Sequence, residues 1–81
     1  MELPSDLLFG DIVLKLYGNH TAIIENYKGI LLYTDTEVVI ACKKIMLRIT
    51  GEELHILYFS NYDMKVQGVI QSIIYMSNGD L

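Results

Sequence analysis

The chain has 81 residues, and six Lys and Arg against ten Asp and Glu give it a formal net charge of −4. This length predicts a single domain over residues 1–81. The acidic balance excludes a nucleic-acid-binding role, because that binding depends on basic groups displacing counterions, and Lys43-Lys44 is the only adjacent basic pair.

Hydrophobic residues make up 52% of the sequence, at the upper edge of the usual range for a globular domain. Several segments are apolar at both odd and even positions, whereas a sheet with one solvated face would alternate apolar and polar residues. The excess predicts a second sheet, a closed barrel or an oligomer interface.

The first residues show no sign of export or membrane insertion. Glu2 and Asp6 stand where a signal peptide would carry Lys or Arg. No apolar run in the sequence approaches the roughly 18 residues that span a bilayer. We therefore expect a soluble or peripheral protein with no direct membrane insertion.

Residues 4–9 predict one short N-terminal helical turn. Pro4 suits the first turn of a helix and Gly10 suits its end. The apolar residues 7–9 would then lie on the main body of the domain.

From residue 11 onward the sequence is typical of short strands separated by polar breaks. The predicted strands cover residues 11–17, 21–26, 30–34, 37–42, 45–49, 54–60, 64–69 and 71–76. Gly29 can supply a positive φ for the turn before the third of these strands. Gly51, Glu52 and Glu53 predict a polar break, Gly68 predicts a β-bulge, and residues 77–81 predict a frayed tail.

Residues 45–49 show the cleanest alternation. Ile45, Leu47 and Ile49 share one face of the predicted strand, and Met46 and Arg48 share the other. We expect the first set to face the core and Arg48 to face solvent.

The spacing of these segments predicts an all-β fold. We expect a small antiparallel meander, sandwich or barrel-like domain of about seven to eight short strands. A β-solenoid is the alternative, since stacked short strands give a similar signature. The antiparallel arrangement is favoured because the connections are hairpin-sized and no residue recurs at a fixed period.

No residues form a recognisable catalytic, metal or cofactor site. His20 and His55 lie far apart and lack the spacing of a metal site, so we expect both at the surface. Cys42 lies in an apolar run, which favours a small buried hydrophobe over a nucleophile. We predict no enzyme activity, no metal and no cofactor.

Four apolar side chains form the candidate interaction surface. Tyr58 and Phe59 end a segment that is apolar at both parities. Ile73 and Tyr75 lie in the terminal strand 71–76, which has a sequence neighbour on one side only and no Pro or Lys to block pairing. We expect self-association, or capture of a partner strand, at this edge.

Four segments together resemble one known family. They are residues 17–19 (Tyr-Gly-Asn), 24–30 (Ile-Glu-Asn-Tyr-Lys-Gly-Ile), 49–56 (Ile-Thr-Gly-Glu-Glu-Leu-His-Ile) and 66–70 (Val-Gln-Gly-Val-Ile). In this order and spacing they are similar to the YabP/YqfC family of sporulation proteins, and most similar to its YqfC branch. The resemblance extends from about residue 3 to residue 76. Tyr27 replaces the expected His, and Lys43-Lys44 replaces the more usual Gly-containing turn.

The resemblance implies a small non-enzymatic protein of endospore-forming bacteria. Such a protein would be made in the cytoplasm of the mother cell and act in building the spore envelope, at the coat or cortex. It would lie at the outer forespore membrane as the soluble partner of a membrane-associated sporulation protein of the YqfD type. The family supplies no catalytic residues to assign.

A small-ligand or carbohydrate-binding β-module is the alternative function. The shape of the apolar surface discriminates between the two. A flat patch or an open strand edge favours assembly, whereas a concave pocket with convergent polar groups favours a ligand.

Overall fold

The computed structural model describes residues 11–77. Six antiparallel strands are present: β1 (Val13–Tyr17), β2 (Thr21–Glu25), β3 (Gly29–Tyr33), β4 (Glu37–Ala41), β5 (Ile45–Phe59) and β6 (Asp63–Ser77). The all-β prediction is confirmed, and the solenoid alternative is wrong because every strand pair is antiparallel. No helix within this range is long and apolar enough to cross a membrane. The helical turn predicted at residues 4–9 lies outside the described residues.

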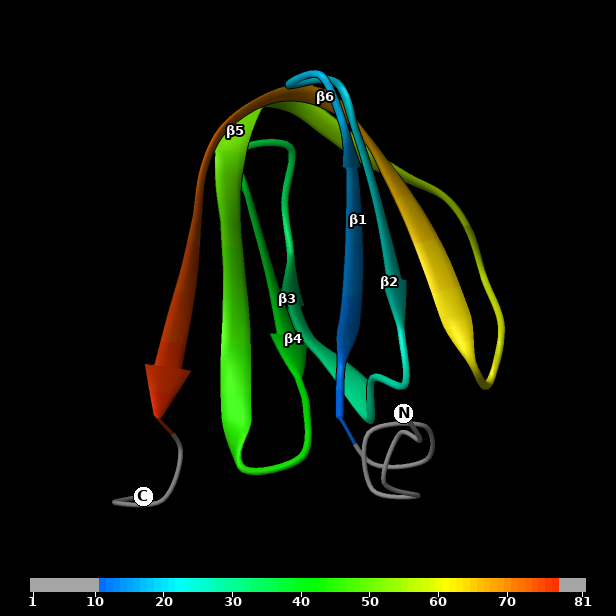
Figure 1. The fold of residues 1–81 in the computed structure, drawn as a ribbon. Coiled ribbons are helices and arrows are strands. Elements are labelled where there is room, and N and C mark those ends of the chain that lie inside the picture. The colour runs from blue at the N-terminus through cyan, green and yellow to red at the C-terminus, as the bar shows by residue number, and fades with distance from the viewer. Residues whose placement is uncertain (1–10, 78–81) are drawn as a thin grey trace, which may run out of the picture.

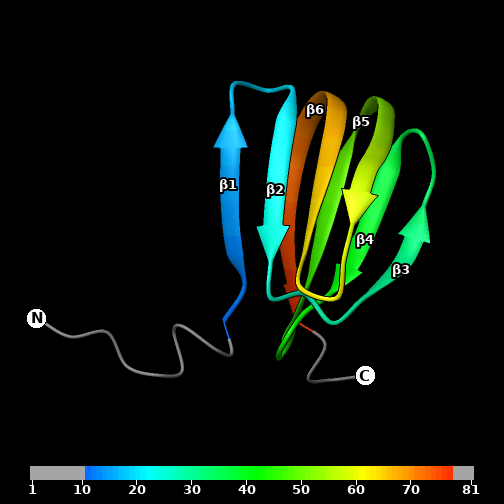
Figure 2. The same cartoon turned by 90° about the vertical axis from the view of Figure 1, so that its right-hand side faces the viewer.

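One sheet holds the strands in the order β1-β2-β6-β5-β4-β3 (Figure 2). The long central strands β5 and β6 both bend near their middle, so the sheet folds over into an arch (Figure 1). We define layer A as β1, β2, residues 63–67 of β6 and residues 55–59 of β5, and layer B as β3, β4, residues 45–50 of β5 and residues 70–77 of β6. The core lies between the two layers.

Two glycines permit the bend. A Cβ atom added to Gly51 would lie 2.0 Å from the carbonyl oxygen of Val69, and one added to Gly68 would lie 2.7 Å from that of Glu53. Gly68 also has a φ of 144°, which side-chain-bearing residues rarely adopt. The prediction of a break at residues 51–53 is therefore wrong, since β5 continues through them. The strands predicted at 64–69 and 71–76 are likewise the two halves of β6.

The bulge predicted at Gly68 lies on the opposite strand. Between Glu52 and His55, β5 places two residues across from the single Gly68 of β6. One of those two residues, Glu53, has a φ of 54°. The extra residue thus belongs to β5, and Gly68 provides the space it needs.

Two hairpin connections fasten the bend from either side. The carbonyl groups of residues 19–20, between β1 and β2, accept N–H groups of β6 at 2.7 and 3.2 Å. Those of residues 35–36, between β3 and β4, accept N–H groups of β5 at 2.7 and 3.0 Å. Backbone hydrogen bonds therefore hold both layers to the same hinge.

The core follows the alternation seen in the sequence. Leu47 and Ile49 are completely buried, while Arg48 points to the other face, as predicted. Cys42 is also buried, as predicted, and burial raises the pKa of its thiol from 9.0 to about 11. The remaining buried members of the core are Ala22, Ile24, Val38, Ile40, Leu54, Met64, Val66 and Ile70.

In the connection between β2 and β3, the residue with a positive φ is not the one predicted. Asn26 has a φ of 69°, whereas Gly29 is the first residue of β3 and has no positive φ. Asn tolerates this conformation better than most residues.

The Tyr27 hydroxyl donates to the carbonyl oxygen of Ser60, which joins the β2–β3 connection to the β5–β6 turn. Burial, followed by the nearby Asp63 carboxylate, raises the pKa of Tyr27.

Candidate interaction surface

A shallow pocket lies between the start of β3 and the β5–β6 turn. Its volume of about 250 Å³ is below the roughly 300–1,000 Å³ of small-molecule sites. Lys28 is the one charged side chain in its lining, and the hydroxyl of Tyr27 is already bonded to Ser60. The small volume and open shape of the pocket therefore do not favour a ligand-binding module.

Titratable side chains are dispersed. Residues 11–77 contain no group of three or more His, Cys, Asp and Glu placed to hold a metal ion. His20 and His55 are both exposed, as predicted. The Nδ1 atom of His20 lies 2.7 Å from the Thr21 hydroxyl oxygen, which also accepts a hydrogen bond from Gln67 at 3.3 Å. These contacts fasten the β1–β2 connection to β6.

The outer face of layer B is largely apolar. Directly paired residues of neighbouring strands lie on the same face of a sheet, so the register groups the side chains into rows. Leu32 and Ile74, at the two ends of one row, are 41% and 43% exposed. We call the following six side chains the apolar face: Leu32, Val39, Ala41, Met46, Ile74 and Met76.

A single ion pair interrupts the apolar face, because Arg48 lies between Val39 and Ile74 in the row that begins in β3. The next row of the same face is polar, with Glu37, Thr50 and Ser72. The Nε atom of Arg48 is 2.5 Å from a carboxylate oxygen of Glu37. Both side chains are partly exposed, so the pair adds less than about 1 kcal/mol to stability. The two charges neutralise each other, which leaves the outer face of layer B without net charge.

Layer B also ends in an unpaired strand edge. β2 pairs only with residues 63–67 of β6, so among the described residues 71–76 have β5 as their one strand partner. The open edge predicted at 71–76 is therefore present. Tyr75 is 62% exposed, although its partner Leu47 places it on the inner face of the layer. Inward-facing apolar surface is thus accessible at this edge.

The sequence model of the YabP family matches residues 11–81, a range that includes every strand described above. The chain belongs to the YabP family. Comparisons with curated proteins and with solved structures gave no match. Membership of the YabP family is consistent with a role in sporulation, and the family is not a known enzyme family.

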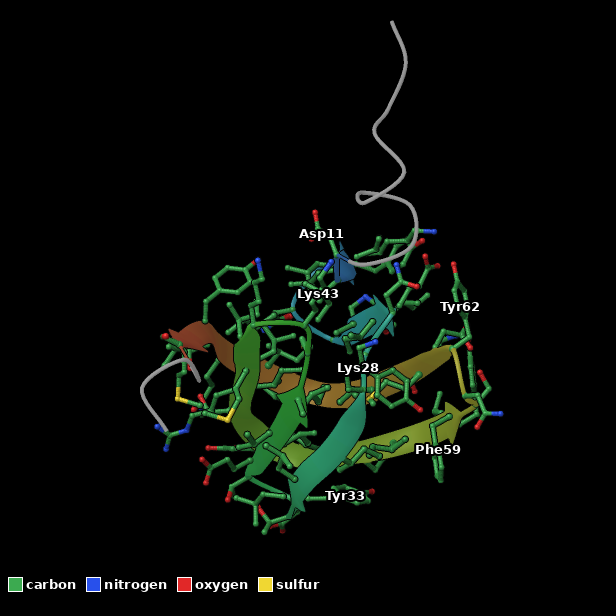
Figure 3. The ribbon with its side chains drawn as sticks, turned by 90° about the horizontal axis from the view of Figure 1, so that it is seen from below. Asp11, Lys28, Tyr33, Lys43, Phe59 and Tyr62 are labelled. Atoms are coloured by element: carbon green, nitrogen blue, oxygen red, sulfur yellow. The ribbon has the colours of Figure 1, made fainter. Side chains whose placement is uncertain are left out.

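The four predicted interaction residues form two separate groups in this YabP-family chain. Tyr58 and Phe59, 47% and 64% exposed, lie at the end of β5 in layer A. Ile73 and Tyr75 lie in the second half of β6 in layer B. Figure 3 shows Phe59 on the opposite side of the molecule from the end of β6. The structure therefore does not unite them into one surface.

Sequence reasoning missed most of the YabP-family chain's apolar face. The alternation at 45–49 already placed Met46 on the outer side, and this signal could have been extended to its neighbours. The position of Leu32 had no such signal, because Leu31 is an extra residue in β3 that shifts the register between Ile30 and Leu32. A bulge of this kind reverses which side chains face outward.

Proposed function

We propose that this YabP-family protein is a non-enzymatic assembly protein of the YqfC branch that acts in building the spore envelope. It works in the mother-cell cytoplasm, at the outer forespore membrane, and binds a membrane-associated sporulation protein of the YqfD type. The observation that carries the proposal is the apolar face of layer B. Family membership supplies the biological setting.

The apolar face has dimensions that suit one structural element of a partner. Four strands about 4.8 Å apart, each presenting about five residues at roughly 3.3 Å, give a face of roughly 19 by 17 Å. A helix with side chains is about 10 Å wide and would lie across such a face. Burying about 320 Å² of apolar surface contributes at most roughly 8 kcal/mol before association costs are subtracted.

Photo-crosslinking in sporulating cells tests the proposed partner. A photoreactive amino acid at position 46 lies on the apolar face, and one at position 15 lies on the outer face of layer A. We expect position 46 to crosslink to a membrane-associated sporulation protein of the YqfD type and position 15 not to do so. Equal labelling from both positions, or crosslinks to soluble proteins alone, would contradict the proposal.

A genetic experiment tests the role in sporulation. Deletion of the gene is expected to lower the yield of heat-resistant spores, and Met46→Glu should reproduce the defect because it buries a charge in the interface. Lys15→Glu is the matched control and should sporulate normally. Normal heat-resistant spores after deletion would refute a role in envelope assembly.

A further inference from the structure

Three of the four strand edges of the two layers are obstructed. The edge of β1 carries Lys15, an exposed charge at its centre. The edge of β3 is bulged at Leu31. On the edge of β5 in layer A, the N–H group of Ile56 is already bonded to the Tyr33 hydroxyl at 2.9 Å. Charges, bulges and occupied N–H groups all discourage pairing with another chain.

The remaining edge has none of these obstructions. Between Ser72 and Met76, β6 pairs with β5 without a register shift. This segment contains no charged residue and no Pro. Side chains on both of its faces are exposed, since Tyr75 faces inward and Ile74 outward.

We propose that residues 72–76 of β6 pair antiparallel with the same residues of a second copy of this chain, across a two-fold axis at Ile74. The second copy is the occupant because an uncharged strand can face itself without repulsion between like charges. This interface shares Ile74 and Met76 with the apolar face but is formed by the backbone edge of β6, and it does not depend on the partner contact proposed above.

The register follows from the faces of the strand. In a continuous sheet, the inward side chains of one copy must lie opposite the inward side chains of the other. A slip of one residue between the two β6 strands would instead set inward side chains opposite outward ones, so registers of that kind are excluded.

A slip of two residues keeps the faces matched and moves the two-fold axis by one residue, to Ile73 or Tyr75. An axis at Ile73 would pair Tyr75 with the bulged Gln71. An axis at Tyr75 would set Tyr75 against itself and Ile73 against the polar Ser77. The axis at Ile74 instead pairs apolar residues with each other on the inner face.

This pairing covers the exposed side chains at the edge. On the inner face, Ile73 would lie opposite the partner's Tyr75, and Tyr75 opposite the partner's Ile73. Pairs of an aromatic and a β-branched residue are favourable across strands. On the outer face, Ile74 would meet the partner's Ile74, which joins the apolar faces of the two copies into one surface.

Sedimentation of the purified full-length chain tests the proposal. We expect a dimer at micromolar concentration, and Ile74→Lys should weaken it roughly tenfold or more because it places like charges on the two-fold axis. Leu16→Lys is the matched control: Leu16 is 51% exposed in β1, and its substitution should leave the dimer unchanged. Circular dichroism must show that both variants are folded.

Oxidative crosslinking tests the register. Paired Cα atoms on antiparallel strands are about 4.5–5.5 Å apart, within the range for a disulfide. Ile74→Cys should therefore give a covalent dimer, whereas Leu16→Cys should not. The native Cys42 is buried and adds no competing exposed thiol.

Either of two results would overturn the proposal. One is a wild-type monomer, including a monomer that dimerises only when residues 1–10 are deleted, since those residues would then occupy the edge themselves. The other is a dimer that Ile74→Lys leaves intact. Both measurements use purified protein without its cellular partner, so crosslinking from position 46 in cells can succeed or fail independently.

Discussion

The two layers of the arch share a core but differ on their outer faces. In layer A the outward side chains include Lys15, Glu25, Asp63 and Lys65, and the Nζ atom of Lys15 lies 3.3 Å from a Glu25 carboxylate oxygen. In layer B the outward side chains are the apolar face together with the neutral pair Arg48 and Glu37 and the hydroxyl groups of Thr50 and Ser72. The outer face of layer A is therefore charged, whereas that of layer B is more apolar and carries no net charge.

The contrast explains where the apolar excess of the composition goes. A domain of this size forms two thin layers, and one of them absorbs the polar residues on its outer side. Exposed apolar side chains remain in both layers: Leu32, Ile74 and Tyr75 lie on the outer face or open edge of layer B, and Leu16, Tyr58 and Phe59 lie on the edge strands of layer A. What distinguishes layer B is an outer face on which apolar side chains of four strands adjoin one another, and adjoining apolar surface of this kind marks interaction sites.

The bend is the place where the two-layer arrangement can be broken most severely. Gly51→Ala would drive a Cβ atom into the backbone of Val69, at 2.0 Å, and should destabilise the fold by about 4 kcal/mol or more. Gly29→Ala is the matched control, because no atom lies within 4 Å of its added Cβ. Urea denaturation measures both. Similar unfolding midpoints for the two variants would show that β5 and β6 do not approach this closely.

Truncation of a side chain should lower the unfolding free energy much more on the inner side of layer B than on its outer side. Leu47→Ala removes a completely buried side chain and should cost roughly 2–5 kcal/mol. Arg48→Ala on the outer side should cost less than about 1 kcal/mol. Both shifts can be read from denaturant midpoints, and equal values would mean that the register of β5 is wrong.

The Cys42 thiol reports burial at the end of layer B through pH. Its pKa is near 9.0 in the unfolded chain and about 11 in the folded protein. The unfolded chain therefore loses its proton first as pH rises. Stability from this group is present below pH 9 and should fall between about pH 9 and 11, by at most roughly 2–3 kcal/mol.

Cys42→Ala provides the control for this pH dependence. Lys and Tyr residues titrate in the same range, so the relevant quantity is the difference between the wild-type and variant unfolding free energies at each pH. That difference should shrink toward pH 11. A constant difference would show that the thiol is not shielded from solvent.

The smallest effect is expected at the β4–β5 turn, which closes layer B. Lys44 has a φ of 70°, a conformation that costs a side-chain-bearing residue roughly 1–2 kcal/mol. Lys44→Gly relieves this strain but adds conformational freedom to the unfolded chain, so the net gain should be below about 1 kcal/mol. Thermal unfolding measures it. Lys43→Gly should not stabilise, and an equal gain there would rule out strain at Lys44.

Local alternation was sufficient to predict most strand positions and the burial of Leu47, Ile49 and Cys42. The bend was not predictable in this way, because residues 51–53 have the composition of a turn. What keeps them within β5 is the close approach of Gly51 to Val69, a contact between residues distant in sequence. The apolar face was missed for a related reason, since it is assembled from four strands by a register that includes a bulge.

β2 meets its partner strand late in synthesis. Thr21 pairs with Gln67, and β1 pairs only with β2, so half of layer A must wait until almost the whole chain has left the ribosome. β3, β4 and residues 45–50 of β5 are joined by short connections and can pair earlier. Nascent chains that stop before residue 63 would leave the apolar side of β2, with Ala22 and Ile24, open to solvent. Premature termination before β6 should therefore yield aggregating fragments, and productive folding depends on the translation of residues 63–77.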